Sequence, residues 1–156
     1  MADWKMTGTI ICGYPGVGKS TVATNRTDIV DAESSAFSHP FDPVTMKQEV
    51  SNDFPRNYID HIIRLASELG GYSYVLVSCH KEVREELDAR SIPYVVVIPH
   101  IGCKDEYMKR YLKRGDSAEF IARMYANWDE WHEEIEENAP AVIHLLAGEM
   151  LADILP

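Results

Sequence analysis

One stretch near the start of the chain has the residue types and the spacing that phosphate binding requires. Residues 13–20 read GYPGVGKS and match the pattern G-x-x-x-x-G-K-[ST] in full. The glycines at positions 13, 16 and 18 allow backbone conformations that a Cβ atom forbids, so successive N–H groups can turn toward one phosphate chain. An apolar run precedes this loop and a helical segment follows it, which places the phosphates at the positive end of a helix.

Two side chains of the loop have separate tasks in this interpretation. Lys19 can reach the outer phosphates as a point charge, and the Ser20 hydroxyl can ligate a magnesium ion that bridges them. We therefore predict ATP and Mg²⁺ as the cofactors. The residues expected to hold the nucleotide are those of the loop and of the first turn after it: Gly13, Gly16, Val17, Gly18, Lys19, Ser20 and Thr21.

A second polar group follows the short apolar run at residues 29–30. In a parallel sheet, residues just beyond the carboxyl end of a strand face the ligand crevice. Asp31 should therefore lie near the loop at residues 13–18, which we call the phosphate loop. Asp31 can accept a proton from a substrate hydroxyl or hold a magnesium-bound water, and Glu33 is a candidate substrate contact. The structural alternative for both is a helix cap or a turn former. A hydroxyl acceptor needs such a base, whereas a phosphate acceptor needs mainly cations, so Asp31 decides the class of acceptor.

The third signal is a basic stretch at residues 109–114. Arg110 and Arg114 are four residues apart, so on a helix they share one face and can both point at transferring phosphates. We predict both as catalytic residues, with Arg123 as a possible addition and a solvated basic face as the alternative. Arg56 is a further candidate for binding the acceptor.

On these residues the chain resembles the P-loop kinases of the adenylate kinase-like class, particularly short nucleotide-kinase-like proteins of phage type. The resemblance rests on residues 13–21, on Asp31 at the end of the second strand and on the Arg-x-x-x-Arg element at 110–114, and it spans most of the length. It implies an α/β three-layer fold with a parallel five-stranded sheet of order 2-3-1-4-5. It also implies a mobile basic lid, here at about residues 103–117, that closes over the phosphates.

One feature departs from the pattern of such nucleotide-binding proteins. The apolar strand that should carry an acidic residue at its end, residues 74–80, reads YVLVSCH and has none. Motor-type and switch-type NTPases use that acid, so its absence favours a small-molecule kinase.

The remaining sequence predicts the elements that position these residues. Short apolar runs alternate with segments of helical period, which is typical of one α/β domain over residues 1–156. We expect strands at 7–12, 28–31, 73–78, 94–98 and 141–144, and helices near 19–23, 44–50, 56–69, 81–89, 104–114, 117–136 and 150–154. The irregular loop at 34–43 is expected to be mobile. The long late helix carries an apolar stripe that should pack into the core: Phe120, Met124, Trp128, Trp131 and Ile135.

Composition limits the partners. The formal charge of −10, from 15 basic and 25 acidic side chains, makes long nucleic acid a poor partner. The three cysteines are too few and too scattered for a disulfide framework, so free thiols are expected. No apolar run is long enough to span a membrane and the N-terminus lacks a signal-peptide pattern, so we expect a cytoplasmic protein. The sequence leaves the oligomeric state open.

These features together predict an enzyme that transfers the γ-phosphoryl group of ATP to a small acceptor, first of all a (deoxy)nucleoside monophosphate. One alternative is a hydroxyl kinase, acting on a nucleoside, a sugar or a polynucleotide end, with Asp31 as the base. An alternative of another class is a non-catalytic regulator that uses the same loop as a nucleotide switch.

Overall fold

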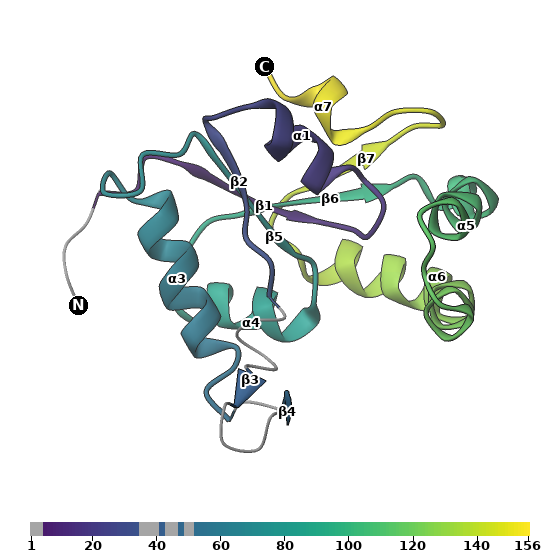
Figure 1. Cartoon of the computed structure of the whole chain (residues 1–156), viewed down its shortest axis with the longest axis horizontal. Helices are drawn as coiled ribbons and strands as arrows, with labels where there is room; N and C mark the ends of the chain where they lie inside the picture. The colour runs from purple at the N-terminus through teal and green to yellow at the C-terminus, as the bar shows by residue number, and fades with distance from the viewer. Residues whose placement is uncertain (1–4, 35–40, 43–46, 49–51) are drawn as a thin grey trace.

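Five parallel strands form the central sheet of the protein. The computed structural model describes residues 5–34, 41–42, 47–48 and 52–156. Its sheet consists of β1 (Thr9–Gly13), β2 (Ile29–Asp31), β5 (Tyr74–Ser78), β6 (Val95–Pro99) and β7 (Val142–Leu145). They lie in the order β2-β5-β1-β6-β7 (Figure 1). Counted along the chain, this order is 2-3-1-4-5, which confirms the predicted sheet.

The strands form where the sequence has continuous apolar runs, because a parallel sheet is buried on both of its faces. β1 is the central strand, and its residues Ile10, Ile11 and Cys12 are all buried. Ile10 lies opposite Val75 of β5, and Ile11 lies opposite Val95 of β6. The phosphate loop therefore leaves the sheet at its most enclosed strand.

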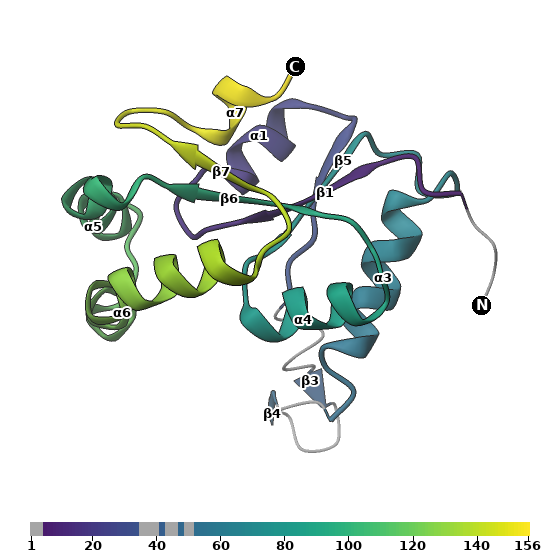
Figure 2. The same ribbon diagram turned by 180° about the vertical axis from the view of Figure 1, so that it is seen from behind.

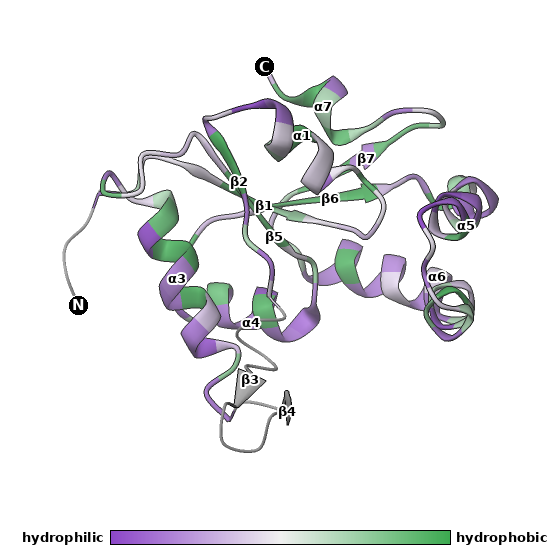
Figure 3. Cartoon of the chain, viewed as in Figure 1, coloured by the Kyte–Doolittle hydropathy of each residue, from purple (hydrophilic) through white to green (hydrophobic). Residues whose placement is uncertain are grey.

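Helices cover both faces of this sheet. One face carries α1 (Lys19–Asn25) and the short α7 (Leu151–Ile154), and the other carries α3 (Arg56–Ala66), α4 (Lys81–Ala89) and α6 (Ala118–Asn138) (Figures 1 and 2). A 3₁₀ turn at Ile101–Cys103 leads into α5 (Lys104–Lys113), which packs against α6 at one end of the sheet. An ion pair between Arg84 and Glu134 joins α4 to α6. Figure 3 shows hydrophobic residues gathered in the central strands and a largely hydrophilic α5.

Two predicted helices differ from the structure. The helix predicted at 56–69 ends at Ala66, because the Ser67 hydroxyl donates to the Arg64 carbonyl (2.7 Å) and Ser67 forms an isolated bridge with Met6. The helix predicted at 44–50 is wrong at Lys47–Gln48, which is strand β4 and pairs antiparallel with β3 (Phe41–Asp42). Cross-strand pairing overrides local helix propensity there. Residues 43–46 and 49–50, like residues 35–40 of the predicted mobile loop, lie outside the described residues.

The apolar stripe of α6 packs into the core as predicted. Trp128 is fully buried, its ring meets Tyr14 edge to face at 5.6 Å between centroids, and its indole N–H donates to the Ile101 carbonyl (2.8 Å). Met124 and Ile135 are buried too, and Phe120 and Trp131 are half-buried against the core. The sequence did not predict that His132 on the same helix would be buried.

Two expectations from composition can be compared with the structure. All three cysteines carry free thiols, which confirms that prediction. Within the described part of the chain, none of the helices combines the length and the apolar character needed to cross a membrane.

The burial of Trp128 generates a stability prediction. Trp128→Ala removes a fully buried ring and should lower the free energy of unfolding by about 3 to 5 kcal/mol, measured by urea unfolding followed with far-UV circular dichroism. Trp131→Ala is the matched control, because Trp131 lies on the same helix but is only half-buried. Equal losses in the two variants would contradict the assignment of Trp128 to the core.

Candidate nucleotide-binding site

The phosphate loop connects β1 to α1 and lies at the carboxyl edge of the sheet. The loop is tied to the neighbouring strand β6 by the Tyr14 N–H, which donates to the Val97 carbonyl at 2.9 Å. Gly16 and Gly18 have φ angles of +90° and +98°, in the left-handed region that side chains other than glycine rarely adopt. Strand, loop and helix thus follow one another as the motif predicts.

Several N–H groups of the loop are available to a ligand. Among the described residues, no hydrogen-bond acceptor serves the N–H groups of Gly16 and Gly18, whereas the Val17 N–H donates to the Tyr14 carbonyl (3.2 Å). The first turn of α1 leaves its own N–H groups without partners inside the helix, as every helix does. A group of free donors at a helix N-terminus fits the phosphates of a nucleotide.

Lys19 lies folded across the loop. Its ammonium donates to the Gly13 carbonyl at 2.9 Å, and a Cβ atom at Gly13 would lie only 2.8 Å from Cδ of Lys19. The motif therefore needs glycine at position 13 to let the lysine side chain pass. Burial lowers the pKa of Lys19 below its ordinary value, and the negative charge of Asp31 opposes that shift. Lys19 and Asp31 consequently belong to one site.

Two carboxylates stand on one side of the segment that follows β2. Ala32 and Ser34 are buried: the Tyr58 hydroxyl donates to the Ala32 carbonyl, and the Ser78 hydroxyl donates to Oγ of Ser34 (2.8 Å). Asp31 and Glu33 alternate with them along the extended chain and so share the other side.

The electrostatics of these carboxylates also connect them to the loop. Burial raises the pKa of Asp31, the Lys19 charge lowers it, and the Glu33 charge raises it. Burial lowers the pKa of His80. The positive charges of Lys19 and Arg123 lower it further, whereas the negative charge of Glu33 raises it. The charges of the predicted residues Asp31 and Glu33 thus act on Lys19, and the charge of Arg123 acts on His80.

The strand end that lacks an acidic residue has a structural role. Ser78 stands at the end of β5, its N–H donates to the Tyr58 hydroxyl (3.3 Å), and its hydroxyl holds Ser34. The position thus fixes the segment that carries Asp31 and Glu33. Neither Tyr58 nor Ser78 belongs to a motif, so sequence reasoning missed them.

The two arginines predicted to share a task lie in different surroundings. Arg110 donates to the Gly16 carbonyl (2.9 Å) and the Glu149 carbonyl (3.2 Å), and it forms an ion pair with Glu106 (2.6 Å). Its guanidinium therefore lies against one carbonyl of the loop, that of Gly16, and one carbonyl of the turn between β7 and α7, that of Glu149. The predicted role of Arg110 at the phosphates stays a prediction; in the structure its donors are held by the carbonyls of Gly16 and Glu149 and by the carboxylate of Glu106.

The charge of Arg114 acts on the lysine. Arg114 ends α5 in an ion pair with Asp116, and its charge lowers the pKa of Lys19 further, after the larger effect of burial. Its predicted role at the phosphates stays a prediction. The mobility of the predicted lid also stays a prediction, although Tyr107 and Tyr111 of α5 are fully buried.

The other predicted residues have less specific surroundings. Ser20 and Thr21 lie in the first turn of α1; Ser20 is exposed, and only its backbone carbonyl has a described partner, the Thr24 hydroxyl (2.8 Å). Arg56 begins α3 and is exposed, and no described contact joins it to the phosphate loop. Their predicted roles in binding magnesium, nucleotide and acceptor remain predictions.

No protein-family model matches the chain, and no curated protein matches it either. The choice of a function therefore depends on the geometry of the loop and its neighbours.

The pKa values of Asp31 and Asp28 are shifted in opposite directions, which predicts how each carboxylate affects stability as the pH changes. Burial raises the pKa of Asp31 above the ordinary 3.8, so its ionised form destabilises the fold. That penalty is absent below pH 3.8 and complete above the raised pKa. Asp31→Asn should therefore increase thermal stability at pH 7 and leave it unchanged near pH 3.

Asp28 is the matched control at the other end of the same strand. A hydrogen bond from Arg26 lowers the pKa of Asp28, so its ionised form stabilises the fold and that stability is lost as the pH falls through the lowered pKa. Asp28→Asn should decrease thermal stability at pH 7. Melting curves from pH 3 to 7 check both, and a loss at pH 7 in the Asp31 variant would contradict a net cost of its charge.

Proposed function

We propose that the protein is an ATP-dependent phosphotransferase that moves the γ-phosphoryl group of ATP to a small acceptor. The observation that carries this proposal is the meeting of three features at one edge of the sheet: free N–H donors in the loop, the ammonium of Lys19, and the carboxylates of Asp31 and Glu33. Phosphoryl transfer requires positioning and charge neutralisation more than covalent chemistry, and these groups are suited to both.

Each group has a task in this proposal. The N–H groups of Gly16 and Gly18 bind phosphate oxygens, and Lys19 exchanges its bond to the Gly13 carbonyl for one to the outer phosphates. Ser20 would ligate Mg²⁺, with Asp31 holding one of its waters. The ion would supply neutralisation of charge on the transferring group.

Two classes of acceptor are proposed. The first is a (deoxy)nucleoside monophosphate. Its phosphate needs positive charge, which Arg114 provides near Lys19 and Arg123 provides near His80. The second is a hydroxyl-bearing acceptor, and a specific observation favours it. The charges of Lys19 and Glu33 both act on Asp31, while Arg110 donates to the Gly16 carbonyl of the loop. Paired carboxylates repel a second phosphate group, and one of them can act as a base toward a hydroxyl.

The proposed setting follows from the same features. Free thiols and a dependence on ATP fit the cytoplasm, and the acidic charge fits a small-molecule acceptor better than long nucleic acid. The non-catalytic alternative is a regulator that binds ATP without transferring it. Release of ADP that depends on one member of an acceptor panel, with nucleosides, nucleotides, sugars and oligonucleotides, distinguishes the enzyme from the regulator.

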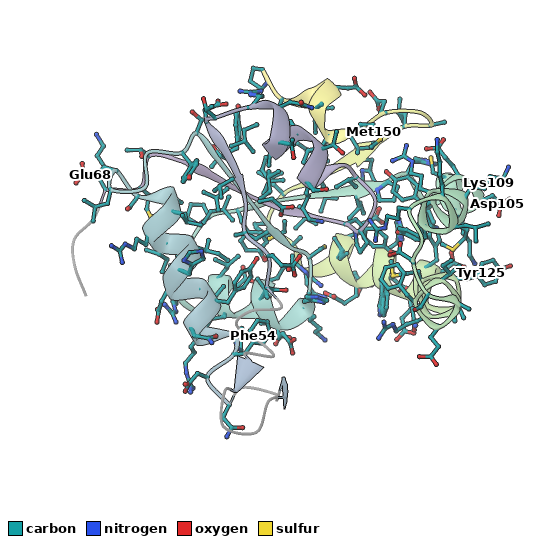
Figure 4. The ribbon with its side chains drawn as sticks, in the orientation of Figure 1. Phe54, Glu68, Asp105, Lys109, Tyr125 and Met150 are labelled. Carbon is teal, nitrogen blue, oxygen red and sulfur yellow. The ribbon has the colours of Figure 1, made fainter. Side chains whose placement is uncertain are left out.

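Lys19 supplies the first test of the proposal. Lys19→Ala should reduce acceptor-dependent ADP release at least about a hundredfold, because it removes the cation that neutralises the transferring group. Lys109→Ala is the control, since that lysine is exposed and lines the hollow between α5 and α6, not the loop (Figure 4). Similar turnover in the Lys19 variant and the wild type would remove the central claim.

Asp31 separates the two acceptor classes. With a hydroxyl acceptor, Asp31→Asn should lower kcat by roughly 10²- to 10⁴-fold, because a base is lost. With a phosphate acceptor the loss should be small and should respond to magnesium concentration, since the acceptor is already ionised near neutral pH. The assay is kcat across a magnesium titration for each active acceptor. A large loss that no magnesium concentration restores would exclude the monophosphate class.

A further inference from the structure

The phosphate loop is contacted on its carbonyl side by parts of the chain that are distant in sequence. Three successive carbonyl groups each accept a hydrogen bond there. The Tyr111 hydroxyl donates to Pro15 (2.7 Å), Arg110 donates to Gly16 (2.9 Å), and the Leu151 N–H donates to Val17 (2.8 Å). The three donors come from α5 and from the start of α7.

These donors are themselves held in place. Arg110 forms an ion pair with Glu106 one turn earlier on α5 (2.6 Å). Glu106 also accepts from the Gly148 N–H (3.0 Å), and Arg110 reaches the Glu149 carbonyl (3.2 Å). The turn between β7 and α7 is thus joined to α5, and Met150, the N-cap residue of α7, lies within this turn (Figure 4).

Packing leaves the loop little freedom on this side. The rings of Tyr107 and Tyr111 are fully buried, and a Cβ atom at Gly16 would lie 3.0 Å from Cε1 of Tyr111. Arg110 also stacks over the Tyr107 ring, with its Cζ 4.3 Å from the centroid. Because Glu106 neutralises Arg110, the arginine contributes geometry here more than net charge.

The planarity of the peptide bond connects the two sides of the loop. In a trans peptide unit, the carbonyl of one residue and the N–H of the next point in opposite directions. Holding the carbonyls of Pro15 and Val17 outward therefore turns the N–H groups of Gly16 and Gly18 inward. The Gly16 carbonyl, held by Arg110, fixes the peptide plane between them, whose Val17 N–H donates to the Tyr14 carbonyl. The N–H groups of Gly16 and Gly18 are the two loop N–H groups for which the described residues offer no acceptor.

We propose that Arg110, Tyr111 and the turn at residues 146–151 form a carbonyl brace that presets the phosphate loop for a nucleotide. Arg110 and Tyr111 are positioning residues in this inference, which rests on the proposed binding of ATP. A preset loop loses less conformational freedom on binding, so the brace raises affinity for every nucleotide that carries a β-phosphate. A lid arginine would instead act mainly on kcat, because its contacts form in the transition state.

Calorimetric titration of the full chain with ADP tests the brace. Arg110→Met keeps the length of the side chain but removes its donors, and it should weaken ADP binding about tenfold. Arg110→Lys keeps the charge without the planar fork and should fall between Arg110→Met and the wild type. Tyr111→Phe removes only the hydroxyl that holds Pro15 and should weaken binding several-fold.

Arg90 provides a matched control on α4. Like Arg110 it pairs with a glutamate four residues earlier, Glu86, and the two arginine side chains have similar exposed fractions of 22% and 19%. Arg90→Met should leave ADP affinity unchanged, and melting curves of every variant establish that the titrations are made on folded protein.

The outcomes separate the brace from the proposed function. A wild type that binds neither ADP nor ATP would overturn the proposed function and the brace together. A wild type that binds ADP, with Arg110→Met binding it equally well, would overturn the brace alone. Equal weakening by Arg90→Met and Arg110→Met would also overturn the brace, because the effect would then reflect general stability.

Discussion

The phosphate loop is subject to one geometric constraint on which the rest of the site depends. Every N–H group turned toward a ligand leaves a carbonyl oxygen on the opposite side of its peptide plane, and a carbonyl oxygen removed from water needs a donor. Here the donors are an arginine, a tyrosine and a backbone N–H from the second half of the chain. The interior of the loop is therefore determined by what surrounds its exterior.

The segment that carries Asp31 and Glu33 is likewise held by hydrogen bonds from residues that are distant in sequence. Tyr58 and Ser78 hold the segment after β2 by Ala32 and Ser34, and the alternation of an extended chain then directs Asp31 and Glu33 the other way. Burial of Asp31 costs stability, as its raised pKa indicates. Sites that hold a charge at such a cost are frequently functional, because structure alone gains nothing from it.

The sequence predicted the sheet and the loop well, because both depend on local patterns. Apolar runs locate the five strands, and the glycines of the motif locate the loop between β1 and α1. It could not indicate contacts that depend on a distant partner. A spacing of four places Arg110 and Arg114 on one helical face, but only the fold reveals that carbonyl oxygens of residues 16 and 149 hold the first of them. Likewise, pairing with β3 makes an extended strand of Lys47–Gln48. Tyr58 and Ser78 carry no motif, so no pattern in the sequence indicated their part in the site.

The three donors that hold the loop carbonyls are translated after the loop itself. The loop at residues 13–18 leaves the ribosome before Arg110, Tyr111 and Leu151, which follow roughly a hundred or more residues later. Contacts of such long sequence separation form late, since the chain between them must first be ordered. The carbonyls of Pro15, Gly16 and Val17 therefore gain these hydrogen bonds only after α5 and α7 have joined the sheet. The loop that the motif identifies is thus completed by groups that are translated after it.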